Sequence, residues 1–248
     1  MSNGWGGRIN YTYSRLMDNQ FGETNFFANT QGNMQDVNNL DAEYSIGLLD
    51  VPHKLVFSPI VELPFGEGKR WATSGVGNAI LGGWTLSSII ALESGFPTAY
   101  WANNASQNFQ LMRRANIINA DAAETDGSRY DRIAPPTGGG CVAGNDCGTG
   151  LWLNAAAFAQ PGTYENGTSD RTNGDIRTPH RNNWDFVATK NIKFVGNVRG
   201  QIRFEVLNLT NTVKVRGPVT VVGASNFGQI RTQSGFMRLT QLMFRLSF

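Results

Sequence analysis

Few residues of this chain combine the type and the spacing that catalysis or metal binding requires. The two histidines, His53 and His180, lie in different segments, and neither has a companion at metal-ligand spacing. The sequence contains neither a GxSxG motif nor a P-loop, and spacing assembles no Ser, His and Asp triad. The acidic run at 119–131 offers oxygen ligands that suit calcium but lacks the EF-hand spacing. We therefore expect no catalytic residue, no metal site and no cofactor, and we do not expect an enzyme.

Cys141 and Cys147 lie in the stretch CVAGNDC, inside a Gly-rich segment. The gap between them does not match the two-residue spacing of zinc and redox motifs, and two thiols are too few for a four-ligand site. We predict a small disulfide that closes this loop in an oxidising compartment. Two free thiols are the alternative.

Tyr100 and Trp101 follow the end of a predicted strand and have Asn neighbours. Exposed aromatic side chains in such a setting suit stacking on a sugar or a peptide. The alternative is that both belong to the aromatic girdle of a membrane protein.

The composition favours strands, turns and long polar loops. Charged residues make up 16% and aromatic residues 11% of the 248 residues, and there are 29 Gly. The net charge is +2 with no run of Lys or Arg, so nucleic acid is not expected as a partner. No apolar stretch is long enough for a transmembrane helix, but alternating strands escape that test even at a mean hydropathy of -0.28. The start, MSNGWGGRIN, has no signal-peptide pattern, so an exported protein would have its beginning elsewhere.

The last thirteen residues, 236–248, show the clearest periodicity. Apolar residues occupy every second position, at Leu242, Phe244, Leu246 and Phe248, and the positions between them are mostly polar. This is the period of a strand. An apolar strand face that ends on an aromatic residue is typical of a lipid-facing strand in an outer-membrane barrel.

Similar alternation predicts six strands in an antiparallel up-and-down meander, near 8–16, 53–63, 83–94, 184–194, 201–210 and 236–248. The connections alternate between long and shorter, as in outer-membrane barrels with long extracellular loops and tight periplasmic turns. The predicted fold is therefore all-β, a partial transmembrane β-barrel. Two residues disagree with it. Pro59 removes a ladder hydrogen bond, so its strand should be bulged or unpaired there, and Lys190 falls on an apolar face, where a midplane lysine costs about 2–4 kcal/mol.

Charged residues at the alternate strand positions, on the face opposite the apolar one, are expected to face the lumen and to pair across neighbouring strands. They are Glu62, Glu93, Arg203, Glu205 and Arg245.

Several motifs follow one another through nearly the whole chain: DVPHKLVFSPIVELPFGEGKRW, NAILGGWTLSSIIALESGFP, LWLNAAAF, RNNWDFVATKNIKF, RFEVLNLTN and FGQI before a terminal Phe. In this order they resemble the C-terminal barrel of Oar-like TonB-dependent outer-membrane receptors. The resemblance implies a large barrel, plugged by an N-terminal domain, that takes up bulky nutrients of the siderophore, glycan or peptide class with energy passed through TonB. It also implies a location in the bacterial outer membrane and a C-terminal strand that the barrel-assembly machinery recognises.

This sequence departs from that family in having no plug, no TonB-contacting segment and only about six strands, too few to close around a wide lumen. We therefore expect residues 1–248 to be the C-terminal segment of such a barrel. The rival hypothesis is a soluble, secreted β-sandwich that binds carbohydrate through its loops, and a surface adhesin is a further alternative.

Overall fold

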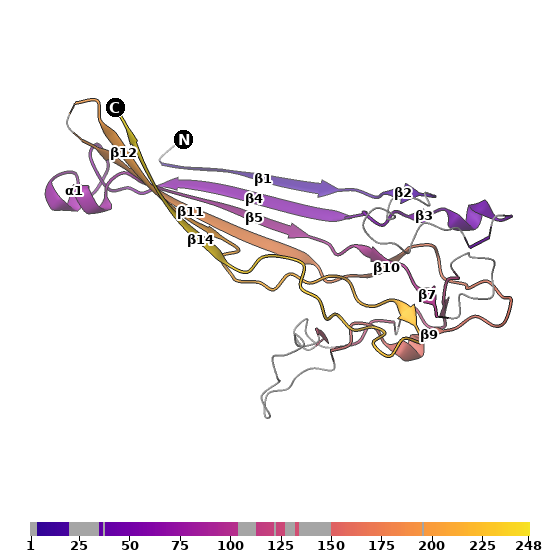
Figure 1. Ribbon diagram of the computed structural model, residues 1–248. Helices are drawn as coiled ribbons and strands as arrows, with labels where there is room; N and C mark the ends of the chain where they lie inside the picture. Colours follow the sequence, from indigo (N-terminus) through magenta and orange to yellow (C-terminus); the bar gives the residue numbers. More distant parts are fainter. Residues whose placement is uncertain are drawn as a thin grey trace, which may run out of the picture.

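A six-stranded antiparallel sheet dominates the computed structural model of the protein (Figure 1). The structure describes residues 4–19, 35–36, 38–103, 113–121, 123–126, 132–133, 150–194 and 196–248. The spatial order of the strands is β1-β4-β5-β11-β12-β14, which follows their order in the chain. Their bounds are Trp5–Tyr13, His53–Glu62, Trp84–Glu93, Arg181–Lys193, Arg199–Leu207 and Leu239–Ser247. The predicted all-β, up-and-down meander is confirmed, and all six expected strands are present.

Pro59 interrupts the sheet locally without changing its register. Pairing of β4 with β5 stops at Ser58 and Pro59 and resumes at Ile60 in the same alignment, so the strand is unpaired there and not bulged. On the other side of β4, Gly7 is the partner of Pro59. A Cβ at Gly7 would lie 3.3 Å from Pro59 Cα, so a glycine relieves crowding beside the ring.

Two connections and both termini lie at one end of the sheet, which we call the turn end (Figure 1). The turn between β11 and β12 is tight, as expected. The connection between β4 and β5 contains the helix α1 (Gly75–Leu81), which the strand periodicity did not predict. Asn78 ties this helix to the preceding turn, because its side-chain oxygen accepts a hydrogen bond from the Glu67 amide at 3.1 Å. No helix among the described residues has the length and hydropathy needed to cross a membrane.

The three long connections, 14–52, 94–180 and 208–238, lie together at the opposite end, and we call their described residues the loop region (Figure 1). The sequence predicted irregular loops here. The structure instead forms four short strand pairs: β2 (Met17–Asp18) with β3 (Ser45–Ile46), β6 (Pro97–Thr98) with β10 (Asn173–Arg177), β7 (Trp101–Ala102) with β13 (Val221–Val222), and β8 (Asn116–Ile117) with β9 (Phe158–Ala159). The described part of the loop region also contains the 3-10 helices η1 (Leu40–Glu43) and η3 (Ala155–Ala157). Most of these elements are too short to produce a periodic signal in the sequence.

The hydrophobic core also lies in the loop region. Its members come from the second and third long connections and include Tyr100, Ala115, Leu153, Phe158 and Ile230. Among the described residues of the six main strands, only Val206 is a buried hydrophobic residue. The molecule therefore has its protein core outside its main sheet.

Candidate functional site

The pairing register divides the main sheet into two faces of opposite character. Residues paired across strands share a face, and successive residues alternate between faces. One face, called the apolar face, carries Trp5, Ile9, Tyr11 and Tyr13 of β1; Leu55, Phe57 and Val61 of β4; Trp84, Leu86, Ile90 and Leu92 of β5; Trp184, Phe186, Ala188 and Ile192 of β11; Ile202, Phe204 and Val206 of β12; and Leu242, Phe244 and Leu246 of β14.

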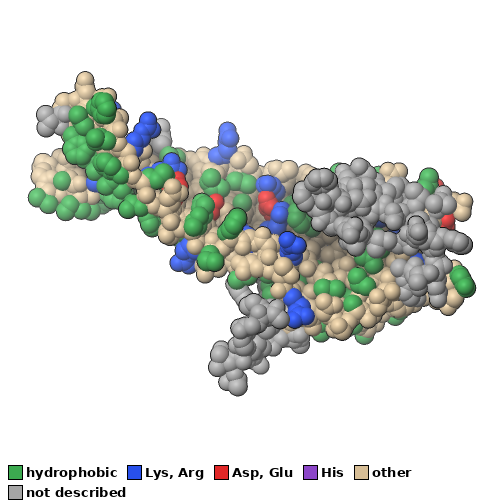
Figure 2. All heavy atoms as spheres, viewed as in Figure 1, with side chains coloured by type: hydrophobic (Ala, Val, Ile, Leu, Met, Phe, Trp, Pro, Cys, Tyr) green, Lys and Arg blue, Asp and Glu red, His purple; other side chains and the backbone are tan. Residues whose placement is uncertain are grey.

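The apolar face is most exposed on the edge strands β1 and β14 and half-buried on much of the inner strands. Ile9 is 69% exposed, Leu242 71% and Phe244 63%. No second sheet within the described part of the chain covers these side chains. The sandwich alternative is therefore wrong, because a sandwich must bury this face between two layers. Figure 2 shows hydrophobic side chains exposed over the molecule and gathered densely at the end that carries α1.

Aromatic residues lie at both ends of the apolar face. Tyr11 and Tyr13 flank His53 at the loop end, and the Tyr11 hydroxyl is hydrogen-bonded to His53 Nδ1 at 2.8 Å. At the turn end, Trp5 is 67% exposed and Trp84 donates its indole N–H to the Ile80 carbonyl at 2.9 Å. Amphipathic rings at both limits of an apolar band are typical of membrane interfaces. The strands contain 9 to 13 residues, and a tilted membrane-crossing strand needs about 9–11.

The opposite side, called the polar face, carries all five predicted lumenal charges: Glu62, Glu93, Arg203, Glu205 and Arg245. Its other polar members include Arg8, Thr12, Lys54, Ser58, Ser87, Arg181, Asp185, Thr189, Lys193, Arg199, Gln201 and Gln241. Its apolar exceptions are Val56, Ile60, Ile89, Ala91, Val187, Leu207, Leu239 and Met243. Arg245 pairs in register with Gln201, while its neighbour Phe244 lies on the apolar face.

The charges on the polar face pair in two ways. Glu93 bridges three strands, because it contacts Lys54 of β4 at 2.8 Å and Arg181 of β11. Arg203 and Glu205 form an ion pair along one strand, in place of the expected pairing between strands. The side chain of Glu62 reaches past its strand and contacts Lys69 at 2.7 Å.

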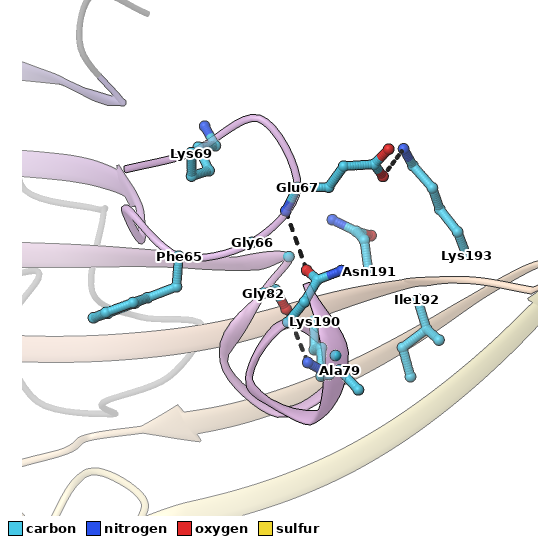
Figure 3. Close-up of a pocket in the computed structure, with 13 residues that line it drawn as sticks. Phe65, Gly66, Glu67, Lys69, Ala79, Gly82, Lys190, Asn191, Ile192 and Lys193 are labelled. Atoms are coloured by element: carbon cyan, nitrogen blue, oxygen red, sulfur yellow. Dashed lines mark hydrogen bonds and ion pairs between the residues drawn. The ribbon is translucent and has the colours of Figure 1, made fainter. Parts of the chain in front are cut away.

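Lys190 projects from the apolar face, but it is neither exposed nor at mid-strand. It lies near the end of the 13-residue strand β11 and is 9% exposed. Its ammonium group donates to the carbonyl oxygens of Ile80 at 2.9 Å and Gly82 at 2.8 Å (Figure 3). It also lies 5.3 Å from the centre of the Trp84 ring. The expected free-energy cost of a lysine at the bilayer midplane does not apply here. The C-terminal end of α1 supplies hydrogen-bond acceptors and a favourable helix dipole to the Lys190 ammonium group.

Tyr100 and Trp101 are not exposed on a loop surface. Tyr100 is 1% and Trp101 5% exposed, and the Tyr100 ring packs against Phe158 with centroids 4.6 Å apart. Burial raises the pKa of the Tyr100 hydroxyl above its usual value. The expectation of exposed, ligand-stacking aromatics is therefore wrong for these two residues, and they do not belong to a girdle either. The chain enters the loop region after β5 ends at Glu93, and Trp101 begins the short strand β7 there, which the sequence pattern did not reveal.

Ion pairs join the first long connection to the second. Arg114 pairs with Glu43, Arg171 with Asp18, and Arg177 with Asp50 at 2.8 Å. Burial lowers the pKa of Arg114, and the nearby Glu43 carboxylate opposes that shift. The sequence alone does not reveal these three pairs, because their partners are far apart in the chain and no local pattern marks them.

Two predicted features involve residues that the structure does not describe. Cys141 and Cys147 both lie outside the described residues, and so does much of the acidic run at 119–131. Within the described part of the chain, no group of three or more His, Cys, Asp or Glu side chains is arranged to hold a metal ion.

A strongly two-faced sheet, with strands of membrane-crossing length and all long connections at one end, defines the wall of a transmembrane β-barrel. The comparison with protein families agrees. The model described as "Outer membrane beta barrel domain" matches residues 1–241, so the chain belongs to this family and is located in the bacterial outer membrane. Neither the comparison with curated proteins nor the comparison with solved structures finds a match.

Proposed function

We propose that this chain forms the C-terminal part of the barrel of a TonB-dependent outer-membrane receptor that takes up a bulky nutrient. The siderophore, glycan and peptide classes are the candidate substrates. The ordered series of motifs that resembles Oar-like receptors supports this proposal, and the membership in an outer-membrane barrel family is consistent with it.

The observation that carries the proposal is the incomplete closure of the sheet. β1 and β14 are at the two edges of the strand order and do not pair with each other. Unpaired strand edges are costly in lipid, since each unsatisfied backbone group costs several kcal/mol. We therefore expect further strands to pair with β1 and β14, and the wide, plugged barrel of this proposal would supply them.

The two faces then receive distinct partners. The apolar face contacts outer-membrane lipid, while the polar face, with Glu62, Glu93, Arg203, Glu205 and Arg245, lines the lumen toward a plug domain. TonB would contact a segment N-terminal to this barrel part. The last strand, with Leu242, Phe244, Leu246 and Phe248, would be recognised by the barrel-assembly machinery. The proposal assigns no catalytic step to any residue.

The loop region supplies the surface that first meets a nutrient. It lies at the end with long connections, which outer-membrane barrels turn toward the outside of the cell. Its own core and ion pairs hold it together, so it is suited to act as a firm rim around the entrance. The disulfide expected between Cys141 and Cys147 would close a short segment of the second long connection.

The deciding experiment has a genetic and a functional part. We expect the reading frame to continue upstream into a plug domain and a TonB-contacting segment. We also expect cells that carry the whole gene to accumulate one siderophore, glycan or peptide only when TonB is present. Uptake that persists unchanged without TonB would contradict the proposal, and so would a barrel that closes through copies of this chain alone.

A further inference from the structure

The helix α1 lies on the lipid side of the barrel wall. Lys190 and Trp84 both project from the apolar face, and both donate to the Ile80 carbonyl near the end of this helix. The Lys190 ammonium also donates to the Gly82 carbonyl (Figure 3). The C-terminal end of α1 is therefore held against the apolar face and not against the polar one.

The apolar side chains of α1 are largely exposed in the described part of the chain. Val76 is 74% exposed, Ile80 61% and Leu81 45%, and the helix contains no buried residue. Its polar residue Asn78 is the one that bonds back to the protein, at the Glu67 amide. The helix thus directs its polar group inward and its hydrophobic groups outward, which is unfavourable in water.

An aromatic residue and a cation lie in the turn that precedes this helix. Trp71 is 50% exposed, and the Arg70 guanidinium lies 5.0 Å from the centre of its ring. Lys69 and Lys193 line the cavity beside the helix, but they pair with Glu62 and Glu67, so the Arg70–Trp71 pair carries the argument (Figure 3). Apolar side chains close to a Trp and an Arg match the boundary between acyl chains and phosphate headgroups.

We propose that α1 and the Arg70–Trp71 pair form a membrane-interface foot, which lies in the headgroup region of the leaflet at the turn end. Its occupant is phospholipid, because the exposed side of α1 continues the lipid-facing surface of the sheet. Short turns of outer-membrane barrels face the periplasm, so this is the inner leaflet of the outer membrane. The inference rests on the barrel and its location and does not depend on TonB or on any nutrient.

Site-directed spin labelling tests this inference. The protein is purified together with the strands that complete its barrel, with Cys141→Ser and Cys147→Ser, and is placed in vesicles of phosphatidylethanolamine and phosphatidylglycerol. A nitroxide is attached at Val76→Cys or at Ile80→Cys. Collision with oxygen, which concentrates in lipid, is compared with collision with a water-soluble nickel chelate. Leu242→Cys is the lipid control and Arg203→Cys is the polar-face control.

We expect the oxygen-to-nickel collision ratio at Val76 and Ile80 to lie within about twofold of that at Leu242, and well above that at Arg203. A ratio equal to that at Arg203 would place the helix in water and overturn the proposal. Low collision with both agents would show that protein covers the helix, which also overturns it.

A pair of matched variants separates insertion from a local effect of the label. With the label at Val76→Cys, Ile80→Leu keeps the apolar side and should leave the ratio unchanged. Ile80→Asp puts a charge on that side and should lower the ratio toward the polar-face value. Equal ratios in the two variants would contradict insertion.

Discussion

The loop region and the main sheet use the same kinds of residue in opposite ways. Leu153 in the loop region is 0% exposed, whereas Leu242 in the sheet is 71% exposed. The loop region packs Tyr100, Phe158 and Phe227 together in its core and holds its connections together with ion pairs. The sheet leaves its hydrophobic residues on the outside, where acyl chains replace a protein core. The difference shows that a hydrophobic residue does not by itself mark a protein core. Whether protein or lipid covers the side chain decides its role.

The largest expected effect breaks the loop region at its buried ion pair. Glu43→Ala leaves the guanidinium of Arg114 buried without its carboxylate, and both side chains are less than 5% exposed. Removing one partner of such a pair costs about 3–5 kcal/mol. A urea titration of the loop region should show this loss when the folded fraction is measured by protection from protease. The matched control is Glu67→Ala in the exposed pair with Lys193, where we expect a loss below about 1 kcal/mol. Equal losses in the two variants would mean that the loop region is not a packed body.

The next effect tests the core of the same region. Leu153→Ala should cost about 2–5 kcal/mol, because it opens a cavity beside Ile230 and Phe227. Hydrogen exchange at the Ala115 amide, which is bonded to the Tyr100 carbonyl, should speed up accordingly. Leu40→Ala in η1 is the control, since Leu40 is 52% exposed and its truncation should leave exchange at Ala115 unchanged.

A charge placed in the sheet should discriminate between its two faces. Leu242→Arg puts a cation on the apolar face near the middle of β14 and should cost about 2–4 kcal/mol in a bilayer. Gln241→Arg, one residue earlier, lies on the polar face opposite Glu205 and should be nearly neutral. Folding into phospholipid vesicles, measured by urea titration, compares the two. Similar losses would contradict the assignment of the apolar face to lipid.

The smallest expected effect concerns the contact between the sheet and α1. Lys190→Met removes two charge-assisted hydrogen bonds, and bonds of this kind stabilise the folded state by roughly 1.5–3 kcal/mol. The substitution also removes a cation beside lipid, which offsets part of that loss. We expect a net loss of about 1 kcal/mol, together with faster hydrogen exchange at the Gly82 amide, which bonds to the Asn78 carbonyl. Unchanged exchange there would mean that Lys190 does not hold the helix.

Local periodicity was sufficient to predict the sheet. The alternation at Leu242, Phe244 and Leu246 placed these side chains on one face, and the observed register puts them there. Strand β11 begins at Arg181, earlier than predicted, because the polar stretch Arg-Asn-Asn shows no apolar alternation and is extended by pairing with β5. The sequence pattern placed Lys190 at the bilayer midplane, which was wrong for a related reason. Nothing in the sequence shows that α1 folds back onto the apolar face.

By itself, the sequence determined the strands, their order, the parity of each side chain and the membrane family, because these depend on a two-residue period and on neighbours along the chain. Only the tertiary structure decided that the three long connections form one body, that Tyr100 and Trp101 lie inside it, and that Glu43 meets Arg114. Those contacts join residues from different connections, and their energies depend on burial, which arises only after the chain has folded.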